Sequence, residues 1–437
     1  MVLKNSVIKR TILELLKKHL SAKEISLIVG ARQVGKTTLM RMLDDMLRSR
    51  GERTVWLNLD VESDRIFFDS QESLVKKLVL EFGKYTGYVF IDEIQRKENA
   101  GLFLKGLYDM DLPYKFIVSG SGSLELKEKI HESLLGRKRV FEMTPVSFGE
   151  FVNFKTENRY EGRLDEFFKI EKTHTEKFLQ EYMQFGGYPR VITEDESREK
   201  ERVINEIFES YIERDISYLL HVERIDAFRG LIKIFAEQTG NMVHYTELSS
   251  TLGISLPTIK NYIAYAEKTF VIRRAYPYFR NTRKEITKSP LIYFNDIGLR
   301  NYARGIFGRT LSSNDGGFLF QNFIANELRH IGTQSSGGDT RFWRSKDGAE
   351  VDIIAELDGE IIPIEVKYKN ITTPSVERSL RSFIGKYAPP KALVVHLGDE
   401  GKMKINDTTV QFIPFTKLYT LFHYTSPSPS ASGTPRQ

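Results

Sequence analysis

The sequence predicts an α/β protein of about three domains, beginning with a phosphate-loop sheet. Three observations carry this prediction. The chain has 437 residues, at roughly 150 residues per domain. A short apolar run leads through a glycine loop into a helical pattern near residue 30, and a strand–turn–strand pattern lies near residue 352. Apolar residues make up 41 % and charged residues 28 %, which is typical of globular proteins and excludes a disordered or fibrous chain.

Composition also restricts the environment of the protein. No stretch approaches about 20 consecutive apolar residues, and residues 1–10 lack the apolar segment of a signal peptide. We therefore expect neither a membrane-spanning nor an exported protein. The absence of cysteine excludes disulfides, thiolate metal sites and cysteine nucleophiles, and it fits a cytoplasmic location. The net charge of +6 favours an anionic partner only where basic residues are concentrated.

The sequence Gly-Ala-Arg-Gln-Val-Gly-Lys-Thr at residues 30–37 matches the pattern G-x-x-x-x-G-K-[ST]. Apolar residues 25–29 precede it as a strand, and residues 38–47 continue with helical periodicity. Glycine lets the backbone N–H groups approach phosphates closely. Lys36 would neutralise the β- and γ-phosphates, and the Thr37 hydroxyl would bind Mg²⁺. The predicted nucleotide-binding residues are Gly30, Ala31, Arg32, Gln33, Val34, Gly35, Lys36, Thr37 and Thr38. The alternative is a glycine turn with a chance lysine.

A second strongly apolar run, residues 88–91, ends in Asp92 and Glu93. This is the Walker B pattern. Asp92 would hold Mg²⁺ through a water, and Glu93 would orient or deprotonate the water that attacks the γ-phosphate. The alternative is that the acidic pair caps the N-terminus of a helix.

A third apolar strand, residues 114–118, is followed by Ser119 and Ser121. Their hydroxyls could sense the γ-phosphate, but glycine–serine runs are also ordinary turn material. Downstream, Arg137 and Arg139 could reach the nucleotide in the same chain or in a neighbouring copy. The second case would make hydrolysis depend on a homo-oligomer. A solvated basic turn is the alternative for this segment.

Several segments together resemble a prokaryotic family of AAA+ ATPases, many of which are known only as predicted ATPases. They are residues 30–39, 90–95, 118–123 and 135–151, and the likeness extends through 185–189 and 211–216 into the C-terminal domain. The resemblance implies ATP and Mg²⁺ as ligands and a core domain over residues 1–155. The sequence shows no guanine-reading Asn-Lys-x-Asp motif in a suitable place, which agrees with ATP.

The middle of the chain is expected to be helical. Residues 164–220 carry Glu, Lys, Phe and Leu at three-and-four spacing, which predicts helices packed beside the ATPase core. In the family this region, residues 156–222, is the lid.

Residues 223–311 resemble a winged helix. A helix-turn-helix pattern places Gly253 at the turn and Pro257 in the first turn of the second helix, and residues 270–274 follow as a wing strand. The following hairpin holds six basic residues and one acidic residue, with aromatic residues between them. This pattern favours contact with DNA phosphates and bases. The predicted DNA-binding residues are Arg273, Arg274, Arg280, Arg283, Lys284 and Lys288. Winged helices also serve as protein docking modules, which is the alternative.

The C-terminal region, residues 312–424, resembles the restriction-endonuclease-like PD-(D/E)xK fold. Its order of a helix Glu327, a strand expected to end near Asp352, a turn, and a return strand with Glu365-x-Lys367 is similar to Holliday-junction resolvases. The resemblance implies that Asp352 and Glu365 bind Mg²⁺, that Glu327 supplements them, and that Lys367 orients water or stabilises phosphate charge. Val351 stands where the motif's Pro would be. The alternative is a pair of surface strands whose charges face solvent.

Together these features predict a Mg²⁺-dependent, ATP-hydrolysing AAA+ ATPase that acts with duplex or branched DNA. Endonuclease activity stays open at this stage. The alternative function is an ATP-driven switch or assembly protein whose nuclease-like domain is inactive and binds protein partners. The Ser/Pro-rich residues 425–437 are predicted to be disordered.

Overall fold

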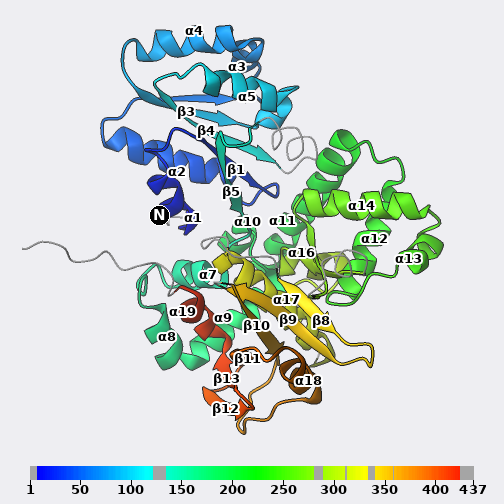
Figure 1. The fold of residues 1–437 in the computed structure, drawn as a ribbon. Coiled ribbons are helices and arrows are strands. Elements are labelled where there is room, and N and C mark those ends of the chain that lie inside the picture. Colours follow the sequence, from blue (N-terminus) through cyan, green and yellow to red (C-terminus); the bar gives the residue numbers. More distant parts are fainter. Residues whose placement is uncertain are drawn as a thin grey trace, which may run out of the picture.

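A computed structural model describes residues 7–121, 134–279, 289–310, 313–332, 340–357 and 359–423. A five-stranded sheet and a six-stranded sheet lie toward opposite ends of the molecule, with helices between them (Figure 1). The 425–437 segment lies outside the described residues, as do four of the predicted DNA-binding residues, Arg280, Arg283, Lys284 and Lys288.

The N-terminal sheet is parallel and has the strand order β2-β3-β4-β1-β5. Its strands are β1 (Ile25–Gly30), β2 (Thr54–Asn58), β3 (Gly87–Asp92), β4 (Tyr114–Ser121) and β5 (Lys138–Met143). The helices of this part are α1 (Ile12–Lys18), α2 (Lys36–Ser49), α3 (Glu62–Arg65), α4 (Gln71–Phe82) and α5 (Ala100–Asp109). Every residue of β1 is buried, as expected for a central parallel strand covered on both faces. Because these strands are parallel, the carboxyl ends of β1, β3 and β4 lie at the same edge of the sheet.

The predicted helical region divides between the two sheets. It follows α7 (Phe148–Lys155) and contains α8 (Leu164–Ile170), α9 (Lys172–Phe185), α10 (Pro189–Thr193), α11 (Ser197–Ser210) and a π-helix, η3 (Tyr211–Leu219). Apolar residues of α10, α11 and η3 join the core of the N-terminal sheet. Those of α8 and α9, like those of α7, instead join a core with the C-terminal sheet. The prediction that the helices of residues 164–220 pack beside the ATPase core is therefore wrong for α8 and α9.

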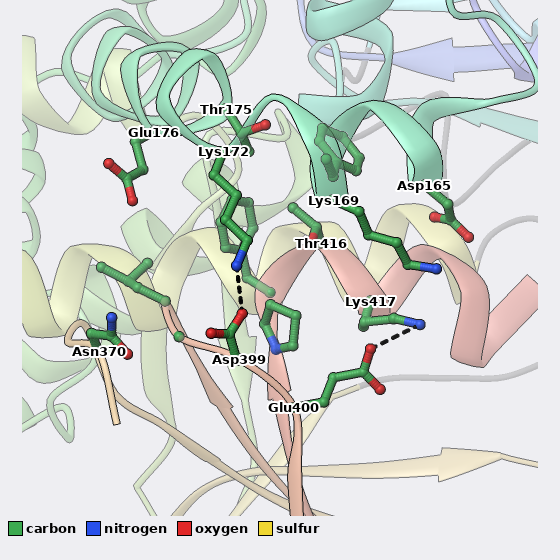
Figure 2. Close-up of a pocket in the computed structure, with 15 residues that line it drawn as sticks. Asp165, Lys169, Lys172, Thr175, Glu176, Asn370, Asp399, Glu400, Thr416 and Lys417 are labelled. Atoms are coloured by element: carbon green, nitrogen blue, oxygen red, sulfur yellow. Dashed lines mark hydrogen bonds and ion pairs between the residues drawn. The ribbon is translucent and has the colours of Figure 1, made fainter. Parts of the chain in front are cut away.

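One ion pair, Lys172 with Asp399, links α9 to the C-terminal part, and a second pair nearby lies within the C-terminal part (Figure 2). Across a cavity of about 230 Å³, Lys172 approaches Asp399 at 2.6 Å and Lys417 approaches Glu400 at 3.1 Å. The cavity lining holds more acidic than basic residues. This balance does not favour an anionic ligand.

The third part contains α12 (Ile225–Glu237), α13 (Tyr245–Leu252), α14 (Leu256–Lys268), the hairpin β6 (Ile272–Ala275) and β7 (Leu291–Phe294), and α16 (Ile297–Arg304). The turn falls at Gly253 as predicted, with φ of +61°, and Ser255 caps α14 by accepting a hydrogen bond from the Thr258 N–H. The assignment as a winged helix stays a prediction.

The C-terminal part has a mixed sheet in the order β12-β13-β11-β10-β9-β8. Its elements are α17 (Ser313–Gly332), β8 (Arg341–Arg344), β9 (Glu350–Leu357), β10 (Glu360–Val366), α18 (Arg378–Tyr387), β11 (Lys391–His396), β12 (Gly401–Ile405), β13 (Thr408–Pro414) and α19 (Leu418–His423). The chain just after β6 joins this sheet at its β8 edge, because the Tyr278 N–H donates to the Phe342 carbonyl at 2.6 Å. The chain that follows β6 is thus packed against the C-terminal part.

Candidate functional site

The loop between β1 and α2 has the conformation that its glycines allow. Gly35 has a left-handed φ of +100°, which favours glycine over residues with side chains. A Cβ on Gly30 would overlap the carbonyl oxygen of Met143 on the neighbouring strand β5. The glycine pattern is therefore required by backbone geometry, and helix α2 starts at Lys36 with its N-terminus facing the loop.

Lys36 is buried within the loop that it follows. Its Nζ donates to the carbonyl oxygens of Ala31 at 2.8 Å and Gly30 at 3.1 Å. Burial lowers the pKa of Lys36, and the nearby carboxylates of Glu93 and Asp215 act in the opposite direction. The ammonium is thus held at the loop by carbonyl oxygens that a phosphate could replace.

Three side chains from α2, β3 and β4 converge at the carboxyl edge of the sheet. The Thr37 hydroxyl donates to Asp92 Oδ2 at 2.8 Å, and the Ser119 hydroxyl donates to Asp92 Oδ1. Ser119 is fully buried on β4 rather than in a turn. Ser121, the other predicted sensor, ends β4, and the structure describes only its backbone.

Glu93 stands directly after this cluster with a left-handed φ of +59°. Its backbone N–H donates to Asp92 Oδ1 at 3.1 Å, while its carboxylate accepts a hydrogen bond from Gln95. Glu93 occupies the N-cap position of the short helix Ile94–Arg96, but its side chain makes no capping hydrogen bond. The geometry thus favours the Walker B interpretation over the capping alternative.

Arg137 lies far from this edge within its own chain. β1 and β5 are paired from Ile25 with Lys138 to Gly30 with Met143, so Arg137 stands at the opposite end of the strands, roughly 16 Å away along the sheet. There its guanidinium pairs with Asp109 of α5 at 2.7 Å. The prediction that Arg137 could reach the nucleotide in the same chain is wrong, and only contact with a neighbouring copy stays a prediction.

Residues that the sequence analysis missed surround the loop instead. Arg32 Nε lies 3.2 Å from Asp215 Oδ2 of η3, and Arg190 donates to Gln33 Oε1 at 3.1 Å. The buried Arg10 donates to the Val34 carbonyl at 3.1 Å. These partners lie between 24 and 183 positions away in the chain. Residues 185–189 and 211–216 contribute to the family resemblance, but no role was predicted for their side chains.

The predicted C-terminal metal residues are brought together in part. Asp352 lies near the start of β9, not at the strand end as predicted, and the Val366 N–H donates to its Oδ2 at 2.8 Å. Lys367 Nζ lies 2.9 Å from Glu365 Oε1 and 2.8 Å from Glu377. β9 and β10 pair antiparallel with Ile353 opposite Ile364, which sets Asp352 beside Glu365.

The environment of these acids opposes their negative charge. Burial and the Glu365 carboxylate raise the pKa of Asp352 well above its usual value. Burial also raises the pKa of Glu365, although Lys367 acts to lower it. Glu365 Oε2 is buried and has no hydrogen-bond partner among the described residues. A divalent cation would satisfy this oxygen and offset the repulsion between the two carboxylates.

Glu327 does not join this pair. Its carboxylate accepts hydrogen bonds from the Phe148 N–H at 3.1 Å and from the Tyr419 hydroxyl, so it contacts the start of α7 and α19. The predicted supplementary metal ligand is therefore a buried structural contact between two parts of the chain. The described residues contain no group of three or more acidic or histidine side chains arranged to hold a metal ion.

Two of the six predicted DNA-binding residues lie in the described part of the chain, and both are engaged internally. Arg273 is buried, with its guanidinium 5.3 Å from the centre of the Tyr293 ring. Arg274 forms an ion pair with Glu267 of α14. These contacts contradict the expectation that Arg273 and Arg274 are surface groups ready to bind phosphate.

Comparison with family models identifies the first part of the chain. Residues 22–152, which carry the loop and the Walker B acids, match the family model described as "AAA domain". We call residues 22–152 the AAA domain after the model that they match. Two further models, both domains of unknown function, match residues 176–310 (DUF8612) and 316–418 (DUF4143). The described helices include none with the length and apolar character needed to cross a bilayer.

Whole-length relatives carry no functional names. The chain is 26 % identical over 408 residues to "Uncharacterized protein Rv2008c" of Mycobacterium tuberculosis, covering 93 % of this chain and 83 % of that one. It is 26 % identical over 412 residues to "Uncharacterized protein MJ1544" of Methanocaldococcus jannaschii, covering 90 % and 88 %. The similarity to both relatives therefore extends well beyond residues 22–152.

Solved structures similar to the chain include three with low overall superposition. A RuvB variant of Thermotoga maritima has a TM-score of 0.29 at 17 % identity and covers 60 % of this chain and 86 % of that one. DnaA of Aquifex aeolicus has 0.27 at 15 %, covering 58 % and 86 %. Cdc6p of Pyrobaculum aerophilum has 0.28 at 9 %, covering 73 % and 96 %.

Proposed function

We propose that this chain is a Mg²⁺-dependent ATPase. One observation carries the proposal: the Thr37 hydroxyl donates a hydrogen bond to Asp92 at 2.8 Å. Thr37 directly follows the buried Lys36 in the chain, and Asp92 directly precedes Glu93. The AAA domain identity supports ATP as the nucleotide. A hydroxyl and a carboxylate are the hard oxygen ligands that Mg²⁺ takes, and Mg²⁺ commonly completes its shell with waters and substrate phosphates. A site with few protein ligands therefore fits this ion.

Each residue of the site has a distinct role in this proposal. The loop N–H groups and Lys36 would bind the β- and γ-phosphates, with the N-terminus of α2 adding a favourable dipole. Thr37 and Asp92 would hold Mg²⁺, which neutralises charge on the phosphates. Glu93 would turn from Gln95 to accept the proton of the attacking water.

The test is steady-state phosphate release from ATP with Mg²⁺, with and without a chelator. Lys36→Ala should abolish nucleotide binding or turnover. Lys76→Ala, which removes an exposed lysine of α4 paired with Glu72, is the matched control and should leave the rate unchanged. A Lys36→Ala protein that hydrolyses ATP at the wild-type rate would contradict the proposal.

A second function is favoured by the half-buried Asp352 and the buried Glu365, which lie side by side. We infer that this pair binds a divalent cation and, with Lys367, cleaves phosphodiester bonds in duplex or branched DNA. The orphaned Glu365 Oε2 supports a cation at this place. Mg²⁺ or Mn²⁺ should raise the melting temperature of the wild type more than that of Asp352→Ala, since a ligand that binds only the folded state stabilises it and the variant would keep only the Thr37–Asp92 site.

The matched control is Glu360→Ala, which removes an exposed acid from the same hairpin. It should retain the cation-dependent rise. DNA cleavage should likewise be lost in Asp352→Ala and kept in Glu360→Ala. Equal cleavage by wild type and Asp352→Ala would mean that the activity comes from a contaminant.

Coupling between the two activities is the remaining part of the proposal. ATP hydrolysis should be stimulated by one form of DNA, and the stimulation should weaken with salt because phosphate contacts release counterions. The assay compares single-stranded, duplex and four-way-junction DNA at two salt concentrations. An unchanged rate would favour the alternative, an ATP-driven switch whose C-terminal domains bind protein partners.

A further inference from the structure

Asp215 brings a carboxylate from outside the AAA domain to the phosphate loop. It lies in η3, a stretch of nine π-helical residues that continues α11. π-helical turns are rare and occur frequently at functional sites. The side chain is 5 % exposed, and its Oδ2 lies 3.2 Å from Arg32 Nε in the loop.

The surroundings of Asp215 are those of an anion-binding position. Lys36 and Arg32, the two cations of the loop, both lie close enough to interact electrostatically with one another and with Asp215. Asp215 Oδ1 is buried without a hydrogen-bond partner among the described residues. Such an oxygen is costly to bury, so the carboxylate is retained here mainly by the two cations.

A nucleoside triphosphate would compete for the same cations. Its γ-phosphate carries more charge than a carboxylate, and arginine binds phosphate oxygens in a bidentate manner. Resting on the nucleotide site proposed above, we propose that Asp215 and the phosphates of ATP compete for Arg32, so that ATP binding breaks the Arg32–Asp215 ion pair and lets η3 move to a second position. Asp215 is thus a positioning residue that makes η3 respond to nucleotide.

The contacts of η3 show which elements a movement of η3 would affect. The Tyr211 ring lies 6.2 Å from that of Phe228 on α12, and the Thr269 hydroxyl donates to the Tyr211 hydroxyl at 3.2 Å. Ile216 is fully buried in the core shared by these helices. A movement of η3 therefore bears directly on the region 225–294, which in turn contacts the C-terminal sheet.

The first test is the equilibrium affinity of the full chain for Mg²⁺–ATP. Asp215→Asn keeps the shape of the side chain but removes the competing charge, so ATP should bind roughly tenfold more tightly, within the usual range of coupling between linked sites. Glu213→Gln makes the same charge change two residues away on an exposed position of η3 and should bind as the wild type does. A loss of folding alone could not produce tighter binding.

Unchanged or weaker binding by Asp215→Asn would overturn this inference, as would equal tightening by both variants, which would indicate a general charge effect. If the wild type and Lys36→Ala both fail to bind ATP, the proposed nucleotide site itself is refuted. That outcome is distinct from a failure of the Asp215 inference, in which the wild type still binds ATP.

A second measurement uses the wild type and does not depend on the variant folding. Backbone amides of residues 211–219 should exchange hydrogen faster with ATP bound than without it, because the Arg32 contact that holds η3 is broken. Exchange rates that ATP leaves unchanged across 211–219 would overturn the inference.

Discussion

The hydroxyl of Thr37 and the carboxylate of Asp92 meet at 2.8 Å, although 55 positions separate them in the chain. The contact joins the first turn of α2, which follows the phosphate loop, to the end of β3. Asp92 is almost fully buried, and the Ser119 hydroxyl occupies its other oxygen. Both carboxylate oxygens of Asp92 are therefore held in place by side chains of neighbouring elements.

Removing the hydroxyl of Thr37 should abolish most Mg²⁺-supported hydrolysis. Thr37→Val keeps the shape but loses the oxygen, and we expect the rate to fall by about 100-fold, since a metal contributes several kcal/mol to the transition state. Thr37→Ser keeps the hydroxyl and should retain activity. The measurement is a Mg²⁺ titration of phosphate release. Equal rates for the two variants would show that the hydroxyl is not a ligand.

Replacing Glu93 by Gln should separate binding from hydrolysis. The amide cannot accept the proton of the attacking water, so hydrolysis should fall by about 100-fold or more, the usual contribution of a general base. ATP affinity should stay near that of the wild type. Glu98→Gln, a change at an exposed acid a few residues later, is the control. A Glu93→Gln protein with wild-type turnover would refute the assignment of the base.

Local sequence was sufficient to predict the central site of the AAA domain. The strand–loop–helix at residues 25–47 and the acids at 92 and 93 each form from residues adjacent in the chain, so their pattern is visible in the sequence. The parallel arrangement then brings them together, because strand ends meet at one edge of the sheet.

Contacts between distant parts of the chain were not predictable in the same way. Asp215 reaches Arg32 across 183 positions, and no local pattern signals that approach. Glu327 fits the order of a metal-binding motif, yet packing turns it toward Phe148. Arg137 follows a plausible motif but lies at the amino end of β5, which depends on strand order rather than composition. In each case, tertiary packing of the partner element decides which side chains come into contact.

Glu150 should be a major contributor to stability at neutral pH. It lies at the start of α7 and binds Arg10 Nε at 2.9 Å, with His330 at 3.6 Å, and all three side chains are largely buried. Removing one partner leaves a buried charge without compensation, so Glu150→Gln should lower the free energy of unfolding by about 3–5 kcal/mol. Chemical denaturation at pH 7 measures this change.

The free energy of unfolding that Glu150→Gln loses should be larger at neutral pH than at acid pH. Burial is the largest single influence and raises the pKa of Glu150, but Arg10, His330 and the Thr11 N–H together outweigh it, so the pKa of Glu150 lies well below its usual value. A depressed pKa gives stability that is present above the unfolded value, near 4.5, and is lost as the pH falls below it. The difference between wild type and Glu150→Gln should therefore shrink by about 1 kcal/mol from pH 7 to pH 4.

An exposed ion pair nearby supplies the control for Glu150. Lys9 and Glu161 lie 2.7 Å apart, but both side chains are more than half exposed. Glu161→Gln should change the free energy of unfolding by less than about 1 kcal/mol, as is usual for surface pairs. If Glu150→Gln were no more harmful than Glu161→Gln, the buried cluster would not stabilise the junction between the AAA domain and α17.

The contact between Gly298 and Phe185 should link stability of the distal helices to nucleotide binding. A Cβ on Gly298 of α16 would overlap the Phe185 carbonyl oxygen, and backbone cannot yield as a side chain can. Gly298→Ala should therefore destabilise the fold by about 1–3 kcal/mol. The segment that this overlap would displace also contains Pro189, which lies close to Gly35 of the phosphate loop: its Cγ is 3.9 Å from the position of a Cβ on Gly35. ATP affinity should therefore fall as well.

Gly385→Ala is the matched substitution. Gly385 lies exposed in α18, and a Cβ there meets no atom within 4 Å, so alanine should stabilise the helix by about 0.5–1 kcal/mol. ATP affinity should not change. Denaturant unfolding and ATP binding, measured on both variants, separate the two cases. Gly298→Ala with full stability and full ATP affinity would mean that the close approach of α16 to residues 185–189 does not hold the phosphate loop in place.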